Sequence, residues 1–196
     1  MASVILVHGI LGQRHLYWNV FKHRLQRDGI RFHDCVLPYG LLGDMRIAAR
    51  YVRDKVESAL LHDGSDKVDL VCHSAGGLVA RYYLMHLGGA SKVRHLVTLG
   101  TPHQGTYFSY VLPVPLLPIA KQARPGSHFL DEINGPGAIP RGVQVTNIWS
   151  PIDGVVVPSQ NSKLPGSVDV KVPWATHWGF LWRRDVYDHV KSLLQA

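Results

Sequence analysis

The stretch that most restricts the fold of this chain is residues 68–80, VDLVCHSAGGLVA. Its first half is a short apolar run typical of a strand, and in its second half apolar residues recur at helical spacing. One serine and two glycines lie between the two halves, which leaves no room for a loop. A strand that reverses into a helix within about three residues forces the apex into a strained backbone and turns its side chain outward. Ser74 is at this apex.

This arrangement is the small-x-Ser-x-Gly pattern of a nucleophile elbow, with Cys72 where the pattern usually has glycine. Cysteine is small and tolerates burial, so the turn is expected to form. Taken alone, a serine after a strand is more often a hydrogen-bonded core or capping residue. The rest of the chain must therefore decide between the two interpretations.

Length and composition indicate one domain, residues 1–196, with an ordinary globular balance of 46% hydrophobic and 18% charged residues. No segment reaches the roughly 20 apolar residues of a membrane span. The chain enters a strand directly after its first residues, so we expect no signal peptide in it, and either a cytoplasmic location or the mature form of a secreted protein. Two cysteines exclude a disulfide framework.

The net charge of +7 comes from basic residues that are scattered along the chain. The only adjacent pair is Arg183-Arg184, and no basic stripe alternates with aromatic residues. We therefore expect no nucleic-acid binding. The excess charge is better suited to solubility or to approaching an anionic interface.

Strands and helices alternate along the chain, which predicts a mostly parallel sheet of about six strands with helices on both faces. A helix expected over residues 16–27 turns Val20, Phe21 and Leu25 inward, and Asp44 is a good N-cap for the next helix. Residues 104–141 break the alternation with glycines and prolines and have one short helix near 128–133. This segment is expected to form a small cap or flap. Predicted strands cover residues 3–7, 31–37, 93–99, 142–149 and 168–172 and the run before Ser74, and further helices cover 45–62, 75–87 and 184–194.

In a parallel sheet, ligands bind at the carboxyl ends of the strands, and the unusual segments of this chain all fall there. A serine hydroxyl needs a base to take its proton and an acid to orient that base. Among twelve histidines, His177 is the best candidate, because it lies in a short loop after the last strand. His103 also follows a strand and is a rival, although its segment fits a tight turn lining a pocket equally well.

Asp153 is the expected acid, since it directly follows a strand; the alternative is a turn aspartate that bonds its own backbone. The order Ser74, Asp153, His177 matches the nucleophile–acid–histidine order of α/β-hydrolases. Acyl transfer also needs donors for the developing oxyanion. We expect the backbone N–H groups of Ala75, directly after the serine, and of Ile10, in the glycine-flanked loop after the first strand.

Four segments now resemble a known family: VHGILG at residues 7–12, CHSAGG at 72–77, TLGTPHQG at 98–105 and SPID at 150–153. They are similar to bacterial triacylglycerol lipases and related esterases, and most similar to the small α/β-hydrolases of the Bacillus lipase type. The resemblance covers nearly the whole chain. It implies the α/β-hydrolase fold with a small lid or none, although residues 104–141 form a longer segment than in the minimal lipases.

The sequence therefore predicts a serine carboxylic-ester hydrolase, a triacylglycerol lipase or carboxylesterase, that cleaves acyl esters of lipids through a Ser-His-Asp triad and an acyl-enzyme. We expect no metal, no cofactor, a monomer and a transient contact with a lipid interface. Substrate contacts are assigned to Leu11, His103, Tyr107 and Trp178. Residues 107–120 form either an acyl-chain wall and flap or a buried plug. The alternatives are a thioesterase, a phospholipase A1, or a catalytically silent hydrolase fold that only binds a ligand.

Overall fold

A computed structural model describes residues 2–12, 17–111 and 116–195. Six strands form one sheet in the order β2-β1-β3-β4-β5-β6, and every neighbouring pair is parallel. This confirms the predicted sheet. The strands are β1 (Val4–Val7), β2 (Phe32–Cys35), β3 (Val68–His73), β4 (Val93–Leu99), β5 (Gln144–Trp149) and β6 (Val168–Lys171). The strand order reverses between β1 and β3, which is where such sheets bind ligands.

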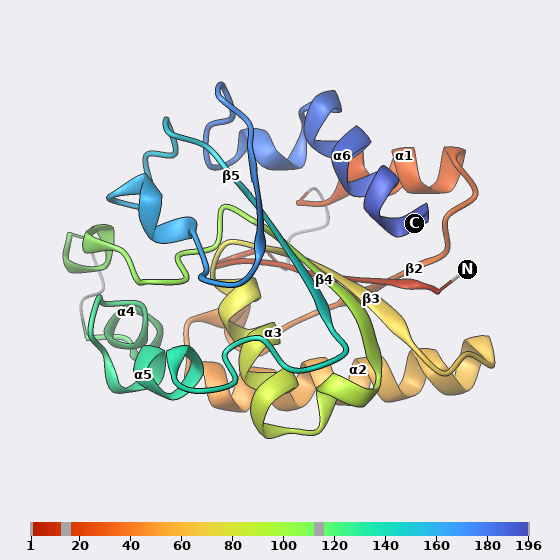
Figure 1. The fold of residues 1–196 in the computed structure, drawn as a ribbon, viewed down its shortest axis with the longest axis horizontal. Helices are drawn as coiled ribbons and strands as arrows, with labels where there is room; N and C mark the ends of the chain where they lie inside the picture. Colours follow the sequence, from red (N-terminus) through yellow and green to blue (C-terminus); the bar gives the residue numbers. More distant parts are fainter. Residues whose placement is uncertain (1, 13–16, 112–115, 196) are drawn as a thin grey trace.

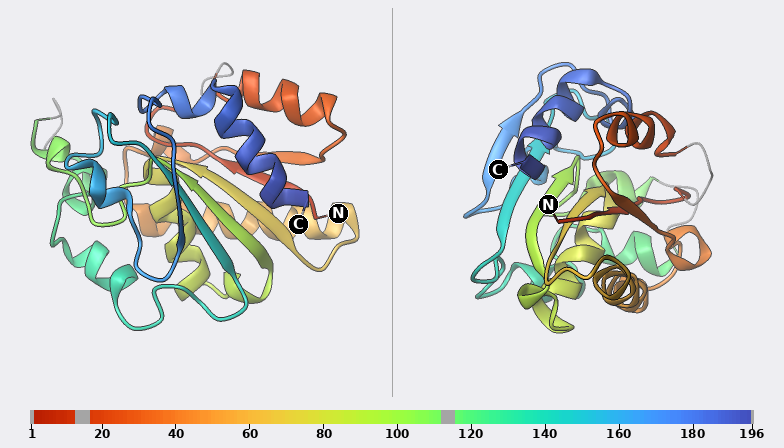
Figure 2. Two further views of the ribbon diagram at one scale, coloured as in Figure 1. Left: turned by 45° about the horizontal axis from the view of Figure 1, so that its top comes forward. Right: turned by 90° about the vertical axis from the view of Figure 1, so that its right-hand side faces the viewer.

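Helices cover both faces of the sheet. Figure 1 shows α1 (Asn19–Arg27) and α6 (Arg184–Gln195) above it, and α2 (Met45–Asp63) and α3 (Ala75–His86) below it. The right-hand view of Figure 2 shows the same three layers end-on. Two buried apolar clusters, one on each side of the sheet, form the core.

Strand β1 shows how the sequence builds these two clusters. Its four residues are all buried, but they alternate between the faces. Val4 and Leu6 pack with the α1 and α6 side, whereas Ile5 and Val7 pack with the α2 and α3 side. Alternation with a period of two is what strand geometry requires. An unbroken apolar run is therefore the expected sequence for a strand covered on both faces.

Two helices test the sequence predictions closely. The Asp44 carboxylate accepts from the Arg46 amide at 2.7 Å, so α2 has the N-cap that was predicted. Helix α1 begins at Asn19, and the predicted start at Leu16 lies outside the described residues. Phe21 and Leu25 are buried as predicted, but Val20 is 40% exposed. The prediction for Val20 was wrong because the inward stripe of this short helix is narrow and excludes the neighbouring position.

The described parts of the segment 104–141, residues 104–111 and 116–141, lie beside the carboxyl ends of the strands, at the left of Figure 1. It contains η3 (Tyr107–Tyr110), α4 (Pro118–Gln122) and α5 (His128–Asn134), of which only α5 was predicted. The Arg81 side chain of α3 is buried and donates to the Ile133 carbonyl and to Asn134 Oδ1. These bonds hold the end of α5 against the helix that follows Ser74. The four remaining short helices are η1 (Pro38–Leu41), η2 (Gly89–Ser91), η4 (Ser159–Ser162) and η5 (Gly179–Leu181).

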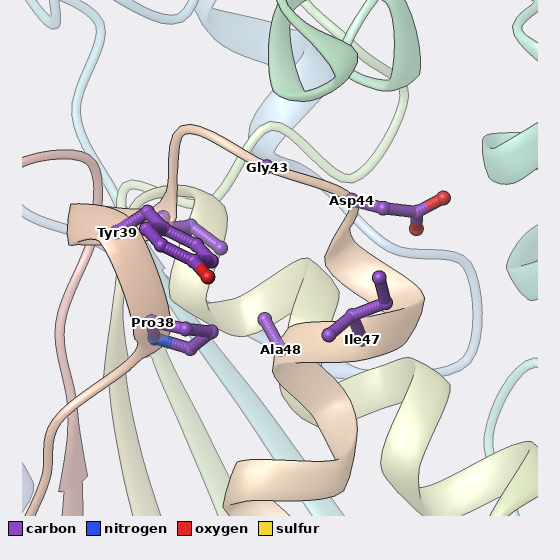
Figure 3. A pocket seen from close by; sticks show the side chains of 7 residues that line it. Pro38, Tyr39, Gly43, Asp44, Ile47 and Ala48 are labelled. Atoms are coloured by element: carbon purple, nitrogen blue, oxygen red, sulfur yellow. The ribbon is translucent and has the colours of Figure 1, made fainter.

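Within the described parts of the chain, no helix combines the length and apolar character that crossing a membrane requires. A hollow of about 70 Å³ lies between η1 and the first turns of α2. Figure 3 shows Pro38 and Tyr39 on one side of it and Ile47 and Ala48 on the other. None of the predicted site residues lines this hollow.

Candidate active site

Ser74 occupies the one-residue turn between β3 and α3. Its backbone angles, φ 56° and ψ −135°, lie in a region that side-chain-bearing residues rarely adopt. Two hydrogen bonds stabilise this strained backbone conformation. The Ser74 amide donates to the Leu99 carbonyl at 2.9 Å, and Thr101 Oγ1 donates to the Ser74 carbonyl at 2.8 Å. The turn therefore has the geometry expected of an elbow that presents a serine hydroxyl.

Two glycines after Ser74 are required by close approach. A Cβ on Gly76 would lie 2.4 Å from the His8 carbonyl oxygen, and one on Gly77 would lie 2.2 Å from Thr101 Oγ1. The first turn of α3 thus packs directly against the backbone that leaves β1. Cys72, which departs from the usual glycine, is fully buried in β3 and leaves the turn intact.

The structure brings Ser74, His177 and Asp153 into one hydrogen-bonded row. Ser74 Oγ lies 2.9 Å from His177 Nε2, and His177 Nδ1 lies 2.9 and 3.0 Å from the two Asp153 oxygens. All three residues are buried. A carboxylate only accepts, so the imidazole carries its proton on Nδ1 and leaves Nε2 free to accept from the serine hydroxyl. The row has the orientation that a general base needs.

The Asp153 carboxylate also accepts from its own turn. Its Oδ1 receives the amides of Val155 at 2.9 Å and Val156 at 3.0 Å. The Asp153 carboxylate therefore both bonds its own turn and contacts the His177 ring. The backbone bonds fix the carboxylate, and the fixed carboxylate fixes the plane of the His177 ring.

The two amides expected to bind an oxyanion have no acceptor among the described residues. Ala75 begins α3, so its N–H is one of the free donors at a helix start. Ile10 follows Gly9, whose carbonyl accepts from His8 Nδ1 at 2.7 Å, while the Leu37 amide donates to His8 Nε2 at 2.9 Å. Because a trans peptide is planar, holding the Gly9 carbonyl also fixes the direction of the Ile10 N–H.

A cavity of about 350 Å³ opens beside Ser74 and His177. This volume is within the usual range of small-molecule sites, and the walls are mostly apolar. Leu11 and Trp178, to which the sequence assigned substrate contacts, line it, and so does Ile10. The other lining residues are Tyr17, Ser74, Ala75, Pro102, Thr106, Phe108, Ser109, Ile119, Ala120, Ala123, Val155 and His177.

Two predicted substrate contacts do not line the cavity. His103 is fully buried and directed at the core, where its Nε2 is 3.1 Å from Thr98 Oγ1 and its Nδ1 accepts from Arg81. Burial and the nearby guanidinium hold the pKa of His103 well below its ordinary value. Tyr107 is 58% exposed and stacks on Tyr110. Their neighbours Pro102 and Phe108 line the cavity instead.

Residues 107–120 divide between the two roles that the sequence left open. The side chains of Ser109, Ile119 and Ala120 are buried and line the cavity, whereas Val111 and Leu116 are exposed. The segment is therefore a wall of the cavity on its inner side. Its central residues, 112–115, lie outside the described part of the chain.

Two side chains that the sequence did not assign to the site contact it. His73 was expected to point away, but its ring lies 4.7 Å from that of His177, and its Nε2 is 2.8 Å from the His177 carbonyl. Tyr17 lines the cavity, and its hydroxyl is 2.6 Å from His73 Nδ1. His73 directly precedes Ser74, and the segment that carries His177 packs against its ring. No local pattern could have revealed this contact.

Among the described residues, one group has metal-ligand types close together: His33, His62 and Asp63, with donor atoms within 4.8 Å of one another. None of them lines the cavity. The Asp63 carboxylate bonds both imidazoles and lies 3.2 Å from the Arg31 guanidinium, whose charge opposes a cation. In the part of the chain that the structure describes, no such group lies around Ser74.

A parallel sheet that reverses at β1/β3, a strained serine after β3, and an acid and a histidine after later strands define the α/β-hydrolase fold. Solved structures agree. A lipase B of Aspergillus fumigatus superposes with a TM-score of 0.84 at 19% identity, over all of this chain and 52% of that one. The mature form of a Bacillus licheniformis lipase superposes with a TM-score of 0.77 at 16% identity, over 98% and 91% of the two chains.

Sequence comparison identifies the family. The family model for palmitoyl protein thioesterases matches residues 3–129, and the chain belongs to this family of α/β-hydrolases. A triacylglycerol lipase of Pseudarthrobacter phenanthrenivorans is 33% identical over 113 residues, which is 54% of this chain and 34% of that lipase. The chain thus aligns with about a third of that relative. These matches confirm the resemblance to small lipases and esterases. The family match includes Ile10, Ser74 and Ala75 and ends before Asp153.

Proposed function

We propose that this protein is a serine hydrolase that cleaves carboxylic esters with an apolar acyl group. The observation that carries the proposal is the row Ser74–His177–Asp153 at the mouth of an apolar cavity. A hydroxyl paired with a neutral imidazole nitrogen is an activated nucleophile, and the carboxylate stabilises the cation that forms.

In the first half of the reaction, Ser74 Oγ bonds to the acyl carbon as its proton moves to His177 Nε2. The carbonyl oxygen becomes an oxyanion, which the Ile10 and Ala75 amides bind. Collapse of this intermediate breaks the ester C–O bond, and the leaving alkoxide takes the proton from His177. A water molecule then repeats both steps on the acyl-serine and releases the acid.

The cavity supports an apolar acyl group. Phe108, Ile119, Ala123 and Val155 line it with aliphatic and aromatic surface, which leaves water while an acyl chain is bound. Leu11 and Trp178 line the same cavity and are each about half exposed. Their exposed apolar surface can contact a lipid surface that supplies the substrate. A short soluble ester does not need this surface, so emulsified and dissolved substrates separate the two roles.

The test is Ser74→Ala in the otherwise unchanged protein. Loss of the nucleophile is expected to lower kcat on a p-nitrophenyl ester by several orders of magnitude, as in subtilisin, where the corresponding loss is roughly 10⁶-fold. The fold should remain, since Ala lacks only the hydroxyl. Near-wild-type turnover in a folded Ser74→Ala variant would refute the proposal.

The family match favours thioesters as a second substrate class. A thioester reacts at the same carbonyl and needs the same base and oxyanion donors, and only the leaving group differs. A palmitoyl thioester and a p-nitrophenyl ester of equal chain length, assayed side by side, give the preference as a ratio of kcat/KM. A ratio that favours the thioester would assign this chain to thioester cleavage.

A further inference from the structure

Three hydrogen bonds form a continuous chain from Gly9 to His177 through the side chains of Tyr17 and His73. The Gly9 amide is 3.2 Å from the Tyr17 hydroxyl, the hydroxyl is 2.6 Å from His73 Nδ1, and His73 Nε2 is 2.8 Å from the His177 carbonyl oxygen. Gly9 precedes Ile10, the proposed oxyanion donor. The chain therefore connects the oxyanion loop to the backbone of the proposed base.

The two ends of this chain fix every proton in it. An amide only donates and a carbonyl only accepts. The Tyr17 oxygen therefore accepts from Gly9, so its hydroxyl proton is donated to His73 Nδ1, and His73 carries its single proton on Nε2. A second proton on Nδ1 would remove the acceptor of the Tyr17 hydroxyl. The chain is complete only when His73 is neutral.

The surroundings keep His73 neutral. The residue is fully buried, and the rings of Trp18, Trp178 and Phe180 lie around it at centroid distances of 6.5, 6.0 and 6.4 Å. Burial, followed by the neighbouring His177, holds the pKa of His73 well below its ordinary value. A neutral neighbour does not repel the cation that His177 becomes during the proposed reaction.

His177 needs such support because it lies outside regular structure. Strand β6 ends at Lys171, η5 begins at Gly179, and the intervening residues have few backbone bonds. The bond from His73 holds the His177 carbonyl, while Asp153 holds its ring. One contact alone leaves the imidazole free to pivot, whereas two contacts fix Nε2 opposite Ser74.

We propose that Tyr17 and His73 are positioning residues, which hold the His177 backbone and the Gly9 amide so that base, nucleophile and oxyanion donor stay aligned. The inference rests on the proposed serine-hydrolase function. It predicts a loss in kcat rather than in substrate binding, because misplacing reacting groups by about 1 Å can cost as much as 100-fold in rate.

The variants Tyr17→Phe and His73→Phe each interrupt the hydrogen-bond chain from Gly9 to His177. Assayed on a short p-nitrophenyl ester, both are expected to lower kcat roughly 10- to 100-fold and to leave KM within about twofold. The double variant should lose less than the product of the two single losses, because both side chains act through the same hydrogen-bond chain. His73→Gln, whose amide can still donate to the His177 carbonyl, should recover part of the loss.

Tyr83→Phe is the matched control. Tyr83 is fully buried on α3, and its hydroxyl has no hydrogen-bond partner among the described residues, so this variant should keep wild-type kcat. Titration with a fluorophosphonate counts active sites, so that kcat refers to folded enzyme only. A readout independent of turnover is the ¹⁵N NMR spectrum of the His73 ring. It should show a protonated Nε2 and an unprotonated Nδ1, and the Nδ1 chemical shift should change in Tyr17→Phe.

The outcomes separate the two proposals. Wild-type kcat in Tyr17→Phe, together with an inactive Ser74→Ala, would overturn the positioning role and leave the proposed function standing. An active Ser74→Ala would refute the proposed function, and the inference with it, because no base would then need positioning. If His73→Phe does not fold, Tyr17→Phe, which removes a single oxygen, decides alone.

Discussion

Four of the buried histidines, His8, His73, His95 and His103, make the stability of this protein sensitive to mild acid. His73 and His103 are fully buried, and His8 and His95 are each 3% exposed. Burial lowers the pKa of all four below the ordinary value, and for His73 and His103 it does so strongly. In the unfolded chain the same residues titrate near pH 6.5. The folded protein therefore binds fewer protons than the unfolded chain in mild acid.

Proton linkage gives the direction and the magnitude of the change in unfolding free energy with pH. Stability rises with pH wherever the unfolded chain binds more protons, so it is fully present above about pH 6.5 and is lost as the pH falls toward the folded-state values. At pH 5.5 each histidine that stays neutral in the folded state costs about 1.4 kcal/mol. His73 and His103 together cost about 3 kcal/mol, and His8 and His95 add at most the same again. A typical domain has only about 5–15 kcal/mol to lose.

Urea unfolding followed by tryptophan fluorescence at pH 7.5, 6.5, 6.0 and 5.5 measures this loss. We expect the free energy of unfolding to fall by about 3–6 kcal/mol over the range. His95→Gln removes one titrating group far from Ser74. In this variant the slope of unfolding free energy against pH should decrease by the equivalent of up to one bound proton, whatever the stability of the variant at pH 7.5. A free energy of unfolding that changes by less than about 1 kcal/mol between pH 7.5 and 5.5 would show that these histidines are not held neutral.

Three further substitutions test the site and its support. Gly76→Ala places a methyl group 2.4 Å from the His8 carbonyl oxygen. It should lower the free energy of unfolding, measured in urea, by about 1–3 kcal/mol or more. Unchanged stability would refute the close packing. Asp153→Asn should lower kcat about 10⁴-fold on a p-nitrophenyl ester, as the corresponding change does in trypsin-like enzymes, and a loss below tenfold would argue against the orienting role. Arg94→Ala leaves the fully buried Asp69 carboxylate without its bidentate partner. Thermal and urea unfolding should show a free energy of unfolding lower by about 3–5 kcal/mol. An unchanged free energy of unfolding would contradict the pairing.

The sequence by itself determined the parts of this protein that depend on short-range geometry. Strand β4 has the predicted bounds, Asp44 caps α2, and Ser74 lies at a one-residue turn between strand and helix. Each follows from local preferences: apolar runs for buried strands, a side-chain acceptor for free amides, and small residues where strand and helix touch. Because the alternation of these elements allows few arrangements, the parallel sheet also followed from the sequence.

The tertiary structure decided what depends on which distant residues meet. His103 and His177 both follow strands, and the sequence favoured His177 from its short loop but could not place either ring. His103 is directed at Thr98 and Arg81 in the core, whereas His177, 103 positions from Ser74, lies 2.9 Å from its hydroxyl. The contact of His73 with the His177 backbone has the same origin. Sequence patterns fix the path of the backbone over a few residues, but the order of strands in the sheet sets which loops lie side by side.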